Sequence, residues 1–246
     1  MSKDIGRLFM DETSIYNLGP SDQSMGKEMP PLEKGYAGRG STIKLPRPKN
    51  DDVGKIDLTE AIEKRRSIRK YLEKPLSLEE LSYLLWATQG VQKNLEKATL
   101  RTSPSAGARH ALENYLLVNK VEGLEKGIYH YIALEHVLQE WEIDSALAEK
   151  ITAACFGQGM VQNSAVTFIW SAVPYRMNWR YGERGYRYLH LDVGHVGQNL
   201  YLAAEATGSG VCAIGAYDDA EINKLLGLNE DEEFVIYLAS VGKKEQ

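Results

Sequence analysis

The order of hydrophobic and polar positions predicts five helices after about residue 57. Apolar residues recur there at intervals of three and four, the spacing that places them on one face of a helix. Ser77 with Glu80 three residues later matches a capping box, and Gly90 suits the end of that helix. Asp57 and Asp144 are expected to cap two of the others. The predicted helices cover residues 57–66, 77–90, 144–155, 185–207 and 221–226.

The longest predicted helix, residues 185–207, carries apolar side chains on two adjoining faces. One face comprises Tyr188, Leu191, His195, Gln198, Leu202 and Ala206, and the other comprises Leu189, Val193, Val196, Leu200 and Ala203. A helix that is apolar over so much of its girth is central to the fold or packs between subunits.

Short apolar runs bounded by turn residues predict strands. Residues 115–118 and 128–131 are joined across Gly123 and Gly127, so we expect a hairpin. Further strands are expected at 165–170, 211–214 and 234–239. This mixed order of helices and strands, with hairpin and crossover links, indicates an α+β sandwich: a central, mostly antiparallel sheet flanked by helices.

Residues 1–56 differ from the rest of the chain, because they are rich in glycine, proline, serine and charge. Pairs such as Gly19-Pro20 and Pro30-Pro31 are typical of turns and extended segments. We therefore expect an extended N-terminal arm over 1–56 that wraps a surface or a partner subunit, followed by one folded domain over 57–246. The alternative for the arm is a disordered tail.

Composition excludes several classes of protein. Of the 246 residues, 43% are hydrophobic and 26% are charged, which is typical of a globular chain, and the net charge of −5 does not favour nucleic-acid binding. Two cysteines are too few for a disulfide scaffold or a cysteine-rich metal site. Without an apolar run long enough for a membrane span, or the apolar core of a signal peptide at its start, the chain is expected to be cytoplasmic.

Several common catalytic motifs are missing from the sequence. It contains no Gly-x-Gly-x-x-Gly, no Walker A motif, no Gly-x-Ser-x-Gly and no Cys-x-x-Cys. The five histidines include no His-Glu-x-x-His pair, and His190 and His195 are five residues apart, a poor spacing for a metal on a helix. We expect no metal site.

The strongest local feature is the basic segment Arg65-Arg66-Ser67-Ile68-Arg69-Lys70-Tyr71. In an extended segment, alternation places Arg65, Ser67 and Arg69 on one side. Two guanidinium groups and a hydroxyl suit a phosphate monoester. The alternative is a solvated helix end, where cations complement the helix dipole.

Four other segments carry weaker signals. The small residues at 104–107 and 213–218 allow a ligand to approach the backbone, and a free N–H at Gly215 or Ala216 could bond a planar ring edge, although ordinary turns explain both segments. Residues 242–244 predict either a frayed basic tail or a second phosphate clamp. The spacing of Arg176, Arg180, Arg184 and Arg187 is typical of a solvated helix face; the functional alternative is a charged patch near a substrate mouth.

Together, these segments resemble the FMN-dependent nitroreductase superfamily, and the likeness extends from residue 58 to residue 243. The basic segment is similar to that superfamily's first flavin-binding motif. Within the superfamily, the chain most resembles the SagB-type, or azoline dehydrogenase, branch. The residues that carry this likeness are 101–110, 181–188, 194–200 and 213–219.

The resemblance implies a homodimer that binds FMN at its interface, with a role for each matching residue. Arg65, Ser67 and Arg66 would hold the phosphate and ribityl chain, and Arg69 would lie beside N1 and the C2 carbonyl. The ring edge would meet Ile214, Gly215 and Ala216, and Lys243 would approach the phosphate. The residues that would reach the flavin of the other subunit are Pro104, Ser105, Ala106 and Gly107.

One departure from the branch concerns catalysis. Members that oxidise peptide azolines are expected to carry a Lys-Tyr pair just before the Gly-Glu-Arg-Gly segment, where this chain has Arg180-Tyr181. Arginine is a poor general base because it stays protonated. Tyr181 remains available as a proton donor or acceptor, so Arg180 and Tyr181 are the candidate catalytic residues.

The resemblance favours a homodimeric FMN oxidoreductase with a ping-pong cycle. Reduced nicotinamide, NAD(P)H, is the expected electron donor, and nitroaromatics or quinone-like molecules are the expected acceptors. One alternative is a SagB-like dehydrogenase that oxidises azoline heterocycles in a modified peptide. Another is a flavin carrier or sensor without turnover.

Overall fold

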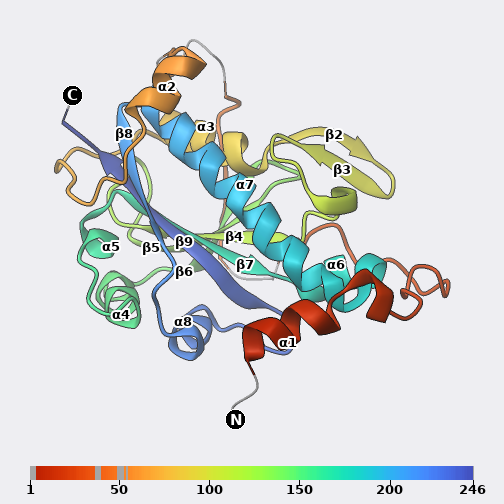
Figure 1. Cartoon of the computed structure of the whole chain (residues 1–246). Helices are drawn as coiled ribbons and strands as arrows, with labels where there is room; N and C mark the ends of the chain where they lie inside the picture. The colour runs from red at the N-terminus through yellow and green to blue at the C-terminus, as the bar shows by residue number, and fades with distance from the viewer. Residues whose placement is uncertain (1–3, 37–39, 49–52, 54, 246) are drawn as a thin grey trace.

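A seven-stranded antiparallel sheet lies at the centre of the computed structural model, which describes residues 4–36, 40–48, 53 and 55–245 (Figure 1). The strand order is β1-β6-β5-β4-β7-β9-β8, and every pair of neighbouring strands runs antiparallel. The strands are β1 (Thr42–Lys44), β4 (Leu112–Val118), β5 (Gly127–Ile132), β6 (Val137–Glu142), β7 (Val166–Ala172), β8 (Ser209–Ile214) and β9 (Phe234–Lys243).

Helices pack on both faces of this sheet. They are α2 (Leu58–Lys64), α3 (Leu78–Gln89), α4 (Leu147–Ala154), α5 (Met160–Asn163), α6 (Pro174–Tyr181), α7 (Gly185–Ala206) and α8 (Asp219–Leu226). Short 3-10 turns are η1 (Ile15–Asn17), η2 (Ala106–Ala108) and η3 (Gly182–Arg184), and a separate hairpin joins β2 (Val91–Leu95) to β3 (Ala98–Arg101). No helix in the described part of the chain is long and apolar enough to cross a membrane.

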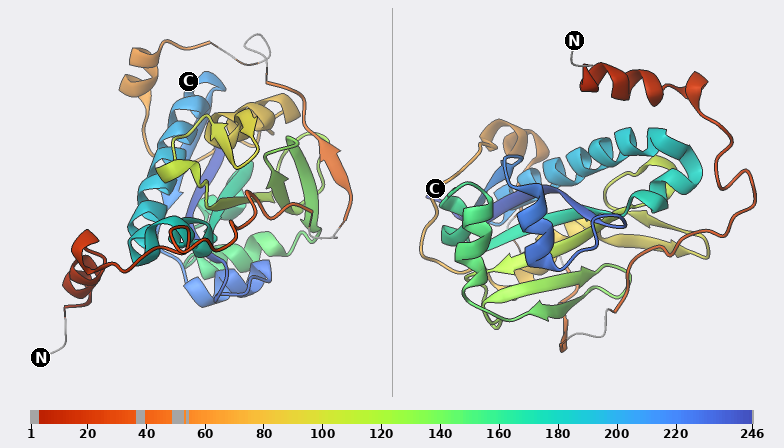
Figure 2. Two further views of the ribbon diagram at one scale, coloured as in Figure 1. Left: turned by 90° about the vertical axis from the view of Figure 1, so that its right-hand side faces the viewer. Right: turned by 90° about the horizontal axis from the view of Figure 1, so that it is seen from below.

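The alternation of side chains along each strand produces two hydrophobic cores. On β4, Leu116 and Val118 face the first core, which α3 and α7 cover, whereas Tyr115 and Leu117 face the second core, which α4, α5 and α8 cover (Figure 2). This arrangement confirms the α+β sandwich, with a sheet that is antiparallel throughout its described strands.

Most of the predicted elements are present. The capping box of Ser77 and Glu80 starts α3, and the hairpin predicted across Gly123 and Gly127 is the β4–β5 pair. One helix start was wrong: α4 begins at Leu147, because Asp144 accepts a hydrogen bond from the backbone N–H of Ala146 (2.8 Å) in a turn before the helix. Strand β6 and the β2–β3 hairpin were not predicted.

The N-terminal arm contains more regular structure than its sequence predicted. Helix α1 (Ile5–Glu12) is capped by Asp4, buries none of its residues and projects from the body of the molecule (Figure 2). Strand β1 adds to the edge of the main sheet beside β6. Within the predicted arm, residues 1–3, 37–39, 49–52 and 54 lie outside the described residues, and they include part of the chain start on which the signal-peptide expectation rests.

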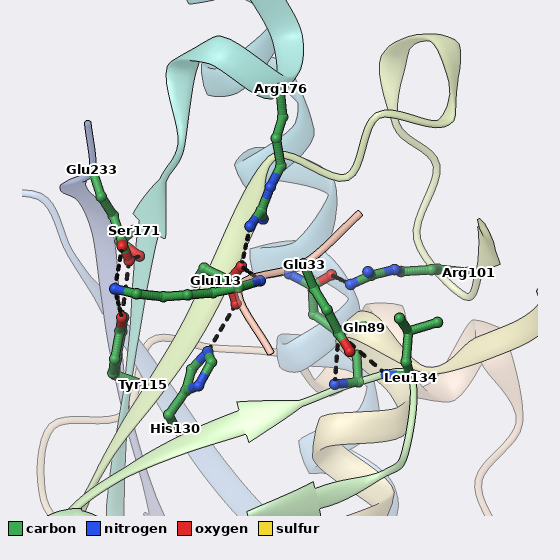
Figure 3. A network of polar contacts seen from close by, with 12 residues as sticks. Glu33, Gln89, Arg101, Glu113, Tyr115, His130, Leu134, Ser171, Arg176 and Glu233 are labelled. Carbon is green, nitrogen blue, oxygen red and sulfur yellow. Dashed lines mark hydrogen bonds and ion pairs between the residues drawn. The ribbon is translucent and has the colours of Figure 1, made fainter. Parts of the chain in front are cut away.

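A buried ionic network connects the arm to the sheet (Figure 3). Glu113 on β4 pairs with Arg176 of α6 at 2.6 Å and with His130 of β5 at 2.8 Å, and it accepts a hydrogen bond from the Lys34 backbone N–H at 2.7 Å. The Lys34 ammonium reaches Glu233 at 2.7 Å. The solvated face expected for the arginine run is therefore wrong for Arg176, because Glu113 draws this side chain into the interior.

Candidate functional site

The basic segment after α2 runs extended beside β8. Ser67 forms a parallel bridge with Val211, and the Ile68 N–H donates to the Val211 carbonyl at 2.9 Å. Ile68 packs so closely on Gly210 that a Cβ at that glycine would lie 2.6 Å from the Ile68 Cβ. Because Ile68 faces inward, alternation leaves Arg65, Ser67 and Arg69 on the opposite, outer side.

Tyr201 of α7 contacts both Arg65 and Ser67 of this segment. Its hydroxyl lies 3.0 Å from Ser67 Oγ and accepts a hydrogen bond from the Ala213 N–H at 2.9 Å. The Arg65 guanidinium lies 5.4 Å from the centre of the Tyr201 ring, within the range of a cation–π contact. Tyr201 was not predicted from the sequence, since it belongs to neither apolar face assigned to the long helix.

The donor groups on this side fit an anionic, planar ligand. Among the described residues, neither Arg65 nor Arg69 has an acidic partner, so both cations are available to a phosphate or a negatively charged ring. Gly215 and Ala216 are exposed after β8, and a Cβ at Gly215 would meet nothing within 4 Å. Ile214, in contrast, is buried in the second core. The described residues contain no cluster of histidine, cysteine and acidic side chains suited to a metal ion.

Two of the predicted cofactor ligands form bonds within the chain. Arg66 donates to the carbonyls of Glu63 at 2.8 Å and Arg65 at 2.7 Å. Lys243 is buried, pairs with Glu80 and donates to the Thr207 carbonyl at 2.6 Å. Contact of Arg66 or Lys243 with a cofactor stays a prediction, and it would require these bonds to be exchanged or shared.

The predicted loop Pro104–Gly107 is anchored to α7 by Asp192. The Asp192 carboxylate accepts from Ser105 Oγ at 2.6 Å and from the Ala106 N–H at 3.2 Å. Burial raises the pKa of Asp192, and the hydrogen bond from Ser105 opposes that shift. Just after the loop, Ala108 and His110 have positive φ angles of 52° and 43°. Such backbone strain in residues other than glycine tends to occur at functional sites.

Gly107 is where this loop meets the candidate catalytic pair. Its φ is +58°, and a Cβ there would lie 2.5 Å from the Tyr181 hydroxyl oxygen and 3.0 Å from Arg180 Cδ. Both the backbone angle and the close approach therefore favour glycine. The structure brings the loop and the Arg180-Tyr181 pair together, although they are separated by more than seventy residues in the sequence.

The predicted site residues thus form two clusters rather than one. We call the group around Arg65, Ser67 and Tyr201 the basic cluster, and the group around Gly107, Arg180 and Tyr181 the loop cluster. Tyr201 of the basic cluster and Asp192, which anchors the loop that contains Gly107, are nine positions apart on α7. At about 1.5 Å per residue, this spacing separates the two points by roughly 13 Å along the helix.

Comparison with known proteins shows the family. The model of the nitroreductase family matches residues 62–243. A protein of Methanocaldococcus jannaschii named as a nitroreductase is 37% identical over 205 residues, which are 83% of this chain and 98% of that protein. The chain belongs to the nitroreductase family. It is an oxidoreductase, as the members of this family are.

Two further proteins are similar to this nitroreductase-family chain. A crystal structure from Anabaena variabilis, named as that of a nitroreductase, is 31% identical with a TM-score of 0.69, and the match covers 84% of this chain and 42% of that one. A trifolitoxin-processing protein of Rhizobium leguminosarum is 35% identical over 109 residues, which are 43% of this chain and 29% of that protein. The second likeness fits the SagB-type branch.

In this nitroreductase-family chain, the two apolar faces of α7 differ in burial. Leu189, Val193 and Leu200 of the second face are buried in the first core. On the other face, Leu191 is 59% exposed, and His195 and Gln198 are exposed as well. We call this face the exposed strip of α7; it combines the exposed apolar side chain of Leu191 with polar side chains.

Proposed function

We propose that this chain is an FMN-dependent oxidoreductase that passes electrons from NAD(P)H to a nitroaromatic or quinone-like acceptor. The observation that carries the proposal is the basic segment, in which Arg65, Ser67 and Arg69 share one side beside β8, the strand that the exposed Gly215 follows. FMN supplies the electron transfer when it is bound. Both cysteines are free and buried, which fits a cytoplasmic location.

The chain's own residues would bind and orient the cofactor in three ways. Arg65 and Ser67 would bind the phosphate, and Tyr201 would hold both of them in place through its ring and its hydroxyl. Arg69 would lie beside the pyrimidine side of the ring, where a fixed cation stabilises negative charge. The exposed backbone at Gly215 would donate an N–H to the ring edge.

We further propose that two chains complete each site. The exposed strip of α7 would lie at a two-fold interface, the commonest arrangement of soluble oligomers. The loop cluster of one chain would then meet the basic cluster of its partner. Tyr181 would supply or accept a proton near the acceptor, whereas Arg180 stays protonated and would contribute charge.

A SagB-like activity is the second candidate, because the trifolitoxin-processing protein resembles part of this chain. In that case, the substrate would be an azoline heterocycle in a modified peptide, and Tyr181 would take part in proton removal. Incubating the purified protein with an azoline-containing peptide and measuring a loss of two mass units would support this candidate. An unchanged peptide mass, with active turnover of nitroaromatics, would favour the first.

The purified protein is expected to be yellow and to contain FMN. The basic cluster has donors for one terminal phosphate, and the sequence lacks a dinucleotide-binding motif. Releasing the cofactor with heat and identifying it by chromatography checks this expectation. FAD in the released fraction, or no flavin after reconstitution, would contradict the proposed function.

Leu191→Glu is expected to convert a dimer into a monomer that loses bound flavin. A carboxylate at the exposed strip of α7 would be buried without a partner at the proposed interface. Light scattering after size-exclusion chromatography measures the molecular mass, and absorbance near 450 nm measures flavin occupancy.

Phe156→Glu is the matched control, because Phe156 is 68% exposed and follows α4 on the other face of the sheet. It should leave the dimer intact. A parent protein that is monomeric and fully occupied by FMN would refute the shared site.

A further inference from the structure

Two arginines meet at Gly107. The Arg109 Nε donates to the Gly107 carbonyl at 3.3 Å, and its terminal nitrogen donates to the Lys97 carbonyl at 3.0 Å. A Cβ at Gly107 would lie 3.1 Å from the Arg180 Nε, so the Arg180 guanidinium group packs against the same glycine. Arg109 is only 6% exposed, whereas Arg180 faces solvent.

The positive charge of this pair has no acidic partner. In the part of the chain that the structure describes, neither Arg109 nor Arg180 forms an ion pair. Burial lowers the pKa of Arg109, and the charge of Arg180 lowers it further. Asp192, the carboxylate of the neighbouring loop anchor, is bonded to Ser105 and Ala106. Two adjacent like charges are unfavourable unless an anion lies between them.

Aromatic rings hold both guanidinium groups in defined positions. The Arg109 guanidinium lies 5.4 Å from the centre of the Trp179 ring, and that of Arg180 lies 5.6 Å from the centre of the Tyr181 ring. Tyr181 in turn packs edge-on against Tyr188, with 4.9 Å between the ring centres. The Arg180 guanidinium forms no hydrogen bond within the described residues, so its planar donors are available to the oxygens of an anion, and Arg109 adds the N–H groups that do not donate to the Gly107 and Lys97 carbonyls.

We propose that Arg109, Arg180 and the Tyr181 hydroxyl bind the anionic group of a substrate, a carboxylate or a phosphate. This proposal rests on the proposed function, since it places the anion beside the loop that would face the partner's flavin. Tyr181 completes the site, because its hydroxyl approaches Gly107 and has no hydrogen-bond partner among the described residues. The enzyme would therefore prefer substrates that carry a negative charge near the reacting group.

The test compares charged and neutral ligands of equal shape. Titration calorimetry measures the binding of benzoate and of benzamide to the purified protein at low ionic strength, without electron donor or turnover. We expect benzoate to bind more tightly than benzamide. In Arg180→Gln, benzoate binding should weaken by about ten- to a hundredfold, the effect of losing one charge-assisted hydrogen bond, while benzamide binding should not change.

Two further variants control for net charge and for folding. Arg7→Gln removes an exposed arginine of α1 and should leave benzoate binding unchanged. Arg180→Lys keeps the charge and should retain part of the benzoate affinity, which a merely structural role would not predict. Equal binding of benzoate by the parent and Arg180→Gln, or equal binding of benzoate and benzamide by the parent, would overturn the proposal.

Kinetic measurements then distinguish the two sources of the anion. If an acceptor carboxylate occupies the site, Arg180→Gln should raise KM for 4-nitrobenzoate more than KM for 4-nitrobenzamide. If the 2′-phosphate of the donor occupies it, the variant should raise KM for NADPH more than KM for NADH. Turnover of nitroaromatics without any benzoate binding would refute the anion site alone, whereas benzoate binding without turnover would refute only the proposed function.

Discussion

Glu113→Ala is expected to lower the free energy of unfolding by about 3–5 kcal/mol, the usual effect of removing one partner from a buried ion pair. Glu113 is 3% exposed and lies between Arg176 and His130, and the Lys34 backbone N–H also donates to it. Without the carboxylate, the charge of Arg176 would stay in the interior with nothing to neutralise it. Urea denaturation followed by tryptophan fluorescence measures the change.

Glu221→Ala is the control for this measurement. Glu221 forms an exposed ion pair with Lys224 on α8, and such surface pairs contribute less than about 1 kcal/mol. A loss of stability in Glu113→Ala that is no larger than in Glu221→Ala would show that the buried network does not stabilise the fold.

The same measurement should depend on pH in a defined direction. Burial alone would raise the pKa of Glu113, but Arg176 and His130 together hold it well below the ordinary value of 4.5. A carboxyl group whose pKa is depressed by folding stabilises the native state above its unfolded pKa. The stability difference between the parent and Glu113→Ala should therefore be full at neutral pH and should shrink as the pH falls below about 4.5.

Arg65→Gln is expected to weaken FMN binding by about ten- to a hundredfold, since one charge-assisted hydrogen bond to the phosphate would be lost. Arg69→Gln should behave differently: it should keep most of its FMN but shift the flavin potential to a more negative value. Flavin fluorescence on dilution measures the affinity, and a dye-equilibrium titration measures the potential.

Arg66→Gln provides a matched control for both variants, because its guanidinium bonds to backbone carbonyls of its own helix end. It should change FMN affinity less than Arg65→Gln does. If Arg69→Gln leaves the potential and the rate of reduction unchanged, Arg69 is only a solvated side chain and its assigned place beside the ring is wrong.

Local patterns predicted the elements that local interactions determine. The capping box before α3 and the apolar faces of α7 are features of neighbouring residues, so they could be recognised without the fold. Helix α1 was missed because its first turns follow a short charged start and precede many turn residues. Strand β1 was missed because it is only three residues long and pairs with β6, almost a hundred positions away.

In the candidate site, too, local features could be predicted from the sequence and features that depend on distant contacts could not. The basic segment could be recognised because alternation alone places Arg65, Ser67 and Arg69 together. The roles of Asp192 and Arg109 could not, since each depends on a loop whose backbone conformation brings it within reach. Tyr201 has no distinguishing neighbour in the sequence, and its contact with Ser67 spans 134 positions.

The contacts of Lys34 with Glu113 and Glu233 indicate which residues fold together as one cooperative unit. The family match starts at residue 62, yet Lys34 neutralises Glu233 near the start of β9, and Glu33 accepts hydrogen bonds from the backbone of Ala133 and Leu134. A chain trimmed to the family boundaries would therefore bury Glu233 without the ammonium of Lys34, and Glu113 would lose the N–H of Lys34. Glu33 and Lys34 are therefore expected to unfold together with the sheet, so the cooperative unit extends beyond the residues that the family match covers.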